Sequence, residues 1–143
     1  MRDETAGNKA AVERFNREVI ERGDAEAFRQ LVAEAFVNRS APTGTPGDRD
    51  AMWSFFAHAL RPALSDLRVE IHDQIAEGDR VATRKTIHGR HTGALFGVAA
   101  TGRPVAIEVM DVVRLSGGRY VEHWGQNDLP SVLGALASTA GGM

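Results

Sequence analysis

The chain has 143 residues, a formal net charge of −2 and no cysteine, which suits a single domain over 1–143 with an ordered core at 8–137. The balanced charge gives no basic face for nucleic acid, and the lack of cysteine excludes disulfides and thiolate chemistry. Because no apolar run approaches the roughly 20 residues that span a bilayer, and the first residues lack the apolar stretch of a signal peptide, we expect a cytoplasmic protein without membrane contacts.

The first part of the chain has the apolar spacing of helices. Gly23 is placed to stop a helix at 8–21, whose apolar face consists of Val12, Phe15 and Val19. Asp24 is placed to cap a second helix with an apolar face formed by Phe28, Leu31, Val32 and Ala35. The two elements are predicted to form a helical hairpin.

A strand and a third helix are expected next. The predicted strand covers 36–39, and a loop rich in proline and glycine covers 40–47. Asp48 is placed to cap a helix that carries Met52, Phe55, Phe56, Ala59 and Leu60. Pro62 and Ser65-Asp66 are expected to close this helix.

From Leu67 onward the apolar period changes from about 3.6 to 2, as in strands. Long strands are predicted at 67–72, 81–87, 105–113 and 120–124, with turns at 77–79 and 117–118. A short closing helix is expected at 129–136, and 138–143 is expected to be a flexible tail. Helices that precede antiparallel hairpins predict an α+β fold in which a curved sheet wraps around the helices.

Several motifs accompany this order of elements: Leu67-Arg-Val-Glu-Ile, Ala76-Glu-Gly-Asp-Arg-Val-Ala, His91-Thr-Gly, Thr101-Gly-Arg and Asp111-Val-Val-Arg with Glu122-His-Trp. Together they resemble the SnoaL-like, or ester cyclase, branch of the nuclear-transport-factor-2-like superfamily over about 9–136. The resemblance implies a cone-shaped antiparallel sheet curled around an internal apolar cavity, often in a homodimer packed through the outer sheet face. Function is less defined, because the superfamily contains cyclases, isomerases, dehydratases, epoxide hydrolases and proteins without known chemistry.

Asp111 is the first candidate catalytic residue. Period 2 places it on the same strand face as Ile107, Val109 and Val113. If that face lines the cavity, burial raises the pKa of the carboxyl, which then stays protonated as a donor or acts as a base near neutral pH. The position resembles the strand of ketosteroid isomerases that carries an oxyanion-binding carboxylic acid, whereas the polyketide cyclases tend to have a histidine there. The alternative is a structural acid paired with Arg114, Arg90 or a backbone amide.

Two histidines are the other catalytic candidates. His91 ends the strand that begins at 81, where an imidazole transfers protons, orients Asp111 or simply bonds to the loop backbone. His123 shares a face with Val121, Gly125 and Asn127, and lies across from Asp111 if that face is inward. The alternative arrangement turns Glu122 and Trp124 inward.

Three further positions are interpreted through the resemblance. Gly125 stands where it implies the acid/base aspartate of the aldol-type cyclases, which argues against that mechanism. Asn38 stands where the cyclases hold a pocket asparagine or histidine, so it either binds a substrate carbonyl or bonds to the loop backbone. Asp128 is better interpreted as the N-cap of the closing helix.

The remaining candidates concern ligand binding. A cavity wall of aromatic and apolar side chains favours a flat apolar or aromatic carbonyl ligand, and its predicted members are Trp53, Phe56, Phe96, Val109 and the polar Asn127. The five histidines lack metal-ligand spacing, and the chain has no phosphate-loop or GxSxG motif, so we expect neither a metal nor a cofactor.

Three functions are compatible with these residues. The first is a cofactor-independent cyclase, isomerase or dehydratase that applies general acid/base chemistry to a polyketide-like or cyclic carbonyl compound. The second is a small-molecule-binding protein of the same fold without chemistry, which Gly125 favours. An epoxide hydrolase is the weakest of the three, because Gly125 also replaces the second aspartate of an Asp-Arg-Asp set.

Overall fold

The computed structural model describes residues 4–141. It begins with two helical segments that are joined by a turn. Helix α1 (Thr5–Arg14) continues as a π-helical segment, η1 (Phe15–Glu21), and α2 (Ala25–Leu31) follows. Gly23 has a φ of 69°, and the Asp24 side chain accepts the backbone amides of the first turn of α2. The predicted helix stop and the predicted cap are both confirmed.

Strand β1 (Val32–Asn38) replaces the end of the predicted second helix. The prediction that Val32 and Ala35 continue the helix is wrong, because this segment pairs in parallel with the last strand and buries Val32 completely. The tertiary pairing overrides the local helical spacing. The strand predicted at 36–39 therefore begins four residues earlier and ends at Asn38.

The third helix is continuous in the chain but changes its winding. It comprises α3 (Arg49–Ser54), the π-helical η2 (Phe55–Leu60) and the short α4 (Arg61–Ala63). The Asp48 side chain accepts the Ala51 amide, which confirms the predicted cap. A strand follows directly at Leu64, three residues before the predicted start.

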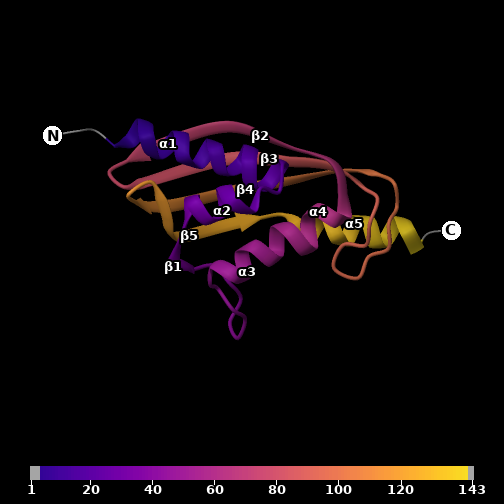
Figure 1. The fold of residues 1–143 in the computed structure, drawn as a ribbon. Helices are drawn as coiled ribbons and strands as arrows, with labels where there is room; N and C mark the ends of the chain where they lie inside the picture. The colour runs from indigo at the N-terminus through magenta and orange to yellow at the C-terminus, as the bar shows by residue number, and fades with distance from the viewer. Residues whose placement is uncertain (1–3, 142–143) are drawn as a thin grey trace.

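Four long strands and β1 form one sheet in the order β1-β5-β4-β3-β2. The long strands are β2 (Leu64–Glu77), β3 (Arg80–His91), β4 (Pro104–Ser116) and β5 (Arg119–Asn127), and neighbours among them pair antiparallel. Because β1 runs parallel to β5, the sheet is mixed, and the expectation of a wholly antiparallel sheet is wrong at this edge. The predicted α+β class with a curved sheet is confirmed, and Figure 1 shows the helices lying against the strands.

Helix α5 (Leu129–Gly141) closes the described chain. It begins at the predicted residue but extends past 136, so the tail expected at 138–143 starts inside the helix, and 142–143 lie outside the described residues. No helix within 4–141 is long and apolar enough to cross a bilayer. The core between helices and sheet is apolar, and its most completely buried members include Val12, Val19, Ile20, Leu60, Val69, Val81 and Val113.

Candidate functional site

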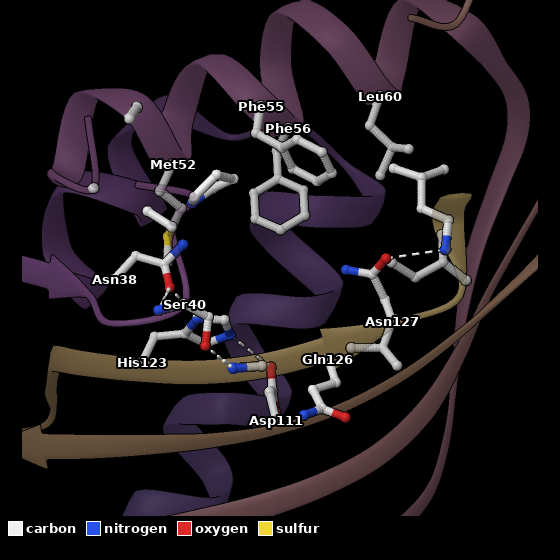
Figure 2. A pocket seen from close by; sticks show the side chains of 18 of the residues that line it. Asn38, Ser40, Met52, Phe55, Phe56, Leu60, Asp111, His123, Gln126 and Asn127 are labelled. Carbon is white, nitrogen blue, oxygen red and sulfur yellow. Dashed lines mark hydrogen bonds and ion pairs between the residues drawn. The ribbon is translucent and has the colours of Figure 1, made fainter. Parts of the chain in front are cut away.

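A pocket of about 510 Å³ opens between the sheet and the third helix. Its size lies within the range of small-molecule sites, and its wall is largely apolar. Figure 2 shows Asp111 and His123 on the strands, with Phe55, Phe56 and Leu60 opposite them on the helix. The pocket therefore combines a largely apolar wall with a few polar groups on the strand side.

Asp111 lies on β4 and enters the pocket together with Ile107 and Val109, as the alternation predicts. Its side chain is only 10% exposed. The Oδ2 atom lies 3.3 Å from His123 Nε2 and 3.9 Å from Lys85 Nζ. The Oδ1 atom is buried and has no hydrogen-bond partner among the described residues. One acceptor oxygen of Asp111 is thus left without a donor in the described part of the chain.

The pKa of Asp111 is lowered, whereas the sequence pattern predicted that it is raised. Burial raises the pKa of this carboxyl, but the Lys85 charge and the His123 hydrogen bond together lower it below its ordinary value of 3.8. The prediction of a carboxyl that stays protonated is therefore wrong, and Asp111 is a carboxylate at neutral pH. Its partner also differs from the predicted arginines, since Arg114 pairs with Glu122 and Arg90 donates to the Gly102 carbonyl.

His123 connects Asp111 to β1. Its Nδ1 atom lies 3.0 Å from Asn38 Oδ1, which also accepts the Ser40 amide at 3.0 Å. Because a backbone amide can only donate, the Asn38 oxygen is the acceptor in both bonds, and Nδ1 must carry a hydrogen. Nε2 faces the Asp111 carboxylate at 3.3 Å. Both ring nitrogens of His123 thus point at acceptor oxygens.

The neighbours of His123 on β5 lie outside the pocket. Glu122 pairs with Arg39 and Arg114, and the Trp124 ring packs under the Arg80 guanidinium at 5.0 Å. The arrangement in which Glu122 and Trp124 turn inward is therefore wrong.

Gly125 provides the space that the His123 ring occupies. A Cβ atom at this glycine would lie 2.7 Å from His123 Cε1 and 3.0 Å from Nε2. The Gly125 amide donates to Ser40 Oγ at 2.8 Å, which ties the strand to the loop after β1. An aspartate at 125 is thus incompatible with the observed position of His123.

Lys85 is the main site residue that the sequence interpretation missed. It lies on β3, is 5% exposed, and donates from Nζ to Asn16 Oδ1 at 2.7 Å. Asn16 is itself fully buried and donates to the Val12 carbonyl, so its oxygen is fixed toward the lysine. Burial lowers the pKa of Lys85, and the nearby Asp111 charge offsets only part of that effect. The signal was present, because the alternation of β3 places Lys85 on the same face as Val81 and Ile87.

Tyr120 is a second missed residue of the pocket wall. Its ring stacks on Phe15 with centroids 4.6 Å apart. Burial raises the pKa of its hydroxyl well above the ordinary value, and the Asp111 charge acts in the same direction. Tyr120 therefore remains a neutral phenol. Other residues of the pocket wall include Ser40, Met52, Ile87, Ile107, Gln126 and Leu129.

His91 and Trp53 lie outside the pocket wall. His91 is fully buried, and its Nδ1 lies 3.0 Å from Thr101 Oγ1 and accepts the Thr101 amide at 3.3 Å. It is therefore a loop-bonded histidine, as the alternative interpretation had it, and the structure does not bring it to Asp111. Trp53 packs on Phe28 with ring centroids 5.1 Å apart.

The other predicted binding residues do line the pocket: Asn38, Phe56, Phe96, Val109 and Asn127. Phe96 is 55% exposed and stacks on Phe55 at 6.1 Å. Asp128 occupies the predicted N-cap position before α5, since its carbonyl accepts the Val132 amide. Its side chain accepts the Glu108 amide instead of an amide of the helix, and the Asn127 side chain accepts the Leu129 amide. Within 4–141 no three acidic or histidine side chains converge as ligands for a metal ion.

Comparison with known proteins places this geometry in a family context. The family model described as SnoaL-like polyketide cyclase matches residues 10–136. The structure of wild-type IdmH from Streptomyces antibioticus, described as "a putative polyketide cyclase", is 28% identical, with a TM-score of 0.75 over 92% of this chain and 98% of that chain. TsrD from Streptomyces laurentii is 23% identical, with a TM-score of 0.79 over 94% of this chain and 99% of that chain.

A more distant structure has the same fold. An LEH-like epoxide hydrolase from M. tuberculosis is 17% identical, with a TM-score of 0.70 over 95% of this chain and 93% of that chain. The comparison with curated proteins finds no match. At identities below a quarter, TsrD and the epoxide hydrolase are evidence of fold alone.

Proposed function

The chain belongs to the SnoaL-like polyketide cyclase family, and on that premise we propose that it is an acid/base enzyme of the cyclase or isomerase type. Its substrate is a small carbonyl compound with an apolar body. The observation that carries the proposal is the Asp111–His123 pair, joined at 3.3 Å, in the wall of an apolar pocket. Paired titratable groups in a cleft are typical of proton-transfer sites.

Asp111 is the proposed base. Its Oδ1 atom is buried, faces no protein donor among the described residues, and belongs to a carboxylate that the Lys85 charge keeps ionised. A hydrogen on the carbon next to a substrate carbonyl transfers to this oxygen. The His123 ring, whose Nε2 lies 3.3 Å from the carboxylate, holds it in place in the resting state and supplies the proton that returns to the product.

Asn38 is the proposed group that holds the carbonyl oxygen. Its Oδ1 atom is engaged by Ser40 and His123, which leaves the amide nitrogen as a donor in the pocket wall. Figure 2 shows the Asn38 oxygen directed toward these two residues. A donor aimed at the oxygen stabilises the enolate that forms when the neighbouring carbon loses its proton.

The wall specifies a flat, neutral body for the substrate. Phe55, Phe56 and Phe15 supply aromatic faces on the helix side, and Ile87 and Ile107 supply aliphatic surface on the sheet. Lys85 and Asp111 already form an ion pair with each other, so a charged group on the ligand would have no free partner of opposite charge in these two residues. A cyclic or polyketide-like carbonyl compound fits these conditions.

Hydrogen exchange at carbon tests the proposal without knowledge of the natural substrate. The probe is 2-tetralone in deuterated buffer, followed by proton NMR. We expect the protein to accelerate exchange next to the carbonyl, and Asp111→Asn to remove about 100-fold or more of that acceleration. The matched control is Asp73→Asn, which alters an acid in an exposed pair with Arg84.

Two outcomes would count against an enzyme. Wild-type protein that exchanges no faster than buffer contradicts the proposal. If 2-naphthol nevertheless binds, the alternative of a binding protein without chemistry, which Gly125 favours, takes its place.

A further inference from the structure

The chain carries only two lysines, Lys9 and Lys85, although lysine and arginine together number 17. Lys9 lies on α1, away from the pocket wall, whereas Lys85 lines the pocket. An arginine at 85 would stay charged at every accessible pH, but a lysine can lose its proton and become a nucleophile. The one lysine in the pocket wall is therefore at a position where a side chain that can lose its proton could react with a bound ligand.

The surroundings of Nζ fix its place and leave it reactive. Asn16 takes one of its three donor positions at 2.7 Å, and Asp111 lies beyond hydrogen-bond distance at 3.9 Å. Asn16 is held there by the π-helical segment η1, and such segments recur at functional sites. The pocket wall that Lys85 lines also includes the apolar side chains of Ile87 and Ile107.

We propose that Lys85 is an amine nucleophile that forms an iminium bond with an aldehyde or ketone bound in the pocket. The inference rests on the proposed function and specifies the class of substrate more closely. It restricts the carbonyl class to aldehydes and unhindered ketones, and excludes esters and amides as substrates. Burial, which lowers the pKa of Lys85, increases the fraction of neutral amine available for attack.

The reaction balances within the site. The Lys85 ammonium gives one proton to the Asp111 carboxylate, and the freed lone pair forms a C–N bond to the carbonyl carbon. That proton and a second one from nitrogen reach the former carbonyl oxygen, the C–O bond breaks, and water leaves. An ammonium and a carbonyl thus become an iminium and water, with the positive charge still on Nζ.

The product of this step suits the same surroundings. The iminium cation lies beside the regenerated Asp111 carboxylate, so the ion pair of the resting site is kept. An iminium also acidifies the adjacent carbon more than the parent carbonyl does, which assists proton removal by Asp111. The apolar wall limits the water that would hydrolyse the bond.

Reductive trapping on the wild-type chain tests the inference. The protein is incubated with 2-naphthaldehyde and sodium cyanoborohydride, and the modified residues are located by peptide mass mapping. We expect Lys85 to be modified in preference to Lys9, because burial lowers the pKa of Lys85 and so raises the fraction of its amine that is neutral. Added 2-naphthol should occupy the pocket and slow the reaction at Lys85 but not at Lys9.

The outcomes separate this inference from the proposed function. Modification confined to Lys9, or modification of Lys85 that 2-naphthol does not slow, overturns the iminium. If trapping fails while 2-tetralone exchange proceeds, acid/base catalysis stands without the covalent step. If Lys85 is trapped while exchange is absent, the nucleophile stands and the proposed proton transfer falls. The Lys85→Arg variant, which keeps the charge, must lose the trapped product at this position.

Discussion

The His123 ring occupies the space next to Gly125 where any other residue would place its Cβ atom, at 2.7 Å from Cε1. The two positions are therefore coupled. A chain that keeps a histidine at 123 in this orientation cannot also carry an aspartate at 125. The glycine at 125 therefore goes together with the observed position of His123, whose Nε2 lies 3.3 Å from Asp111 Oδ2.

This coupling predicts the effect of Gly125→Ala. The added methyl group should displace the ring from Asp111, lower the free energy of unfolding by about 1–3 kcal/mol and slow 2-tetralone exchange. The control is Gly134→Ala in α5, where a Cβ meets nothing within 4 Å and a helix interior gains about 0.5–1 kcal/mol. Urea titration and the exchange assay measure both. Equal behaviour of the two variants would refute the coupling.

Lys85→Met should destabilise the chain more than the small change in side-chain volume alone would. It removes the cation that offsets the burial of Asp111, and breaking a buried pair from one side typically costs about 3–5 kcal/mol. The double variant Lys85→Met/Asp111→Asn should regain part of this loss, because no unpaired charge is left behind. Denaturant titrations at pH 7 complete the cycle. Additive losses would show that Lys85 and Asp111 do not interact.

Much of the local structure could be predicted from the sequence because its signals are local. The caps at Asp24 and Asp48 and the face of Asp111 follow from neighbours within a few residues. The partners of the site residues could not be predicted in this way. Lys85 bonds to Asn16, 69 residues away, and β1 replaces a helix because of its pairing with β5. Such contacts depend on tertiary packing, and an apolar period of 2 or 3.6 carries no information about it.

The Asp111 carboxylate should make stability depend on acidity in a defined direction. Its pKa in the folded chain lies below the ordinary 3.8, so its contribution is fully present above that pH and is lost as the pH falls through the folded value. The difference in unfolding free energy between wild type and Asp111→Asn should therefore shrink below pH 3.8. Titrations at several pH values measure it. A difference that grows on acidification would mean that the carboxyl is protonated in the folded chain.

The outer face of the sheet is the proposed contact of a homodimer. Met110 on the central strand β4 is 63% exposed, and Ala106 on the same face is exposed as well. Sedimentation equilibrium should find a dimer, and Met110→Glu should shift it toward monomer. The control is Ala10→Glu on the exposed side of α1. A wild-type chain that sediments as a monomer would exclude this contact.

Phe56 and Trp53 separate ligand binding from packing on one helix. Phe56 lines the pocket, whereas Trp53 packs on Phe28 outside it. Phe56→Ala should weaken 2-naphthol binding about tenfold or more, since removing a buried ring forfeits roughly 1.5–3 kcal/mol of apolar contact. Trp53→Ala should lower the free energy of unfolding and leave the affinity unchanged, because its ring does not reach the ligand. Calorimetric titration of both variants measures the affinities, and an equal loss in the two would mean that the ligand binds elsewhere.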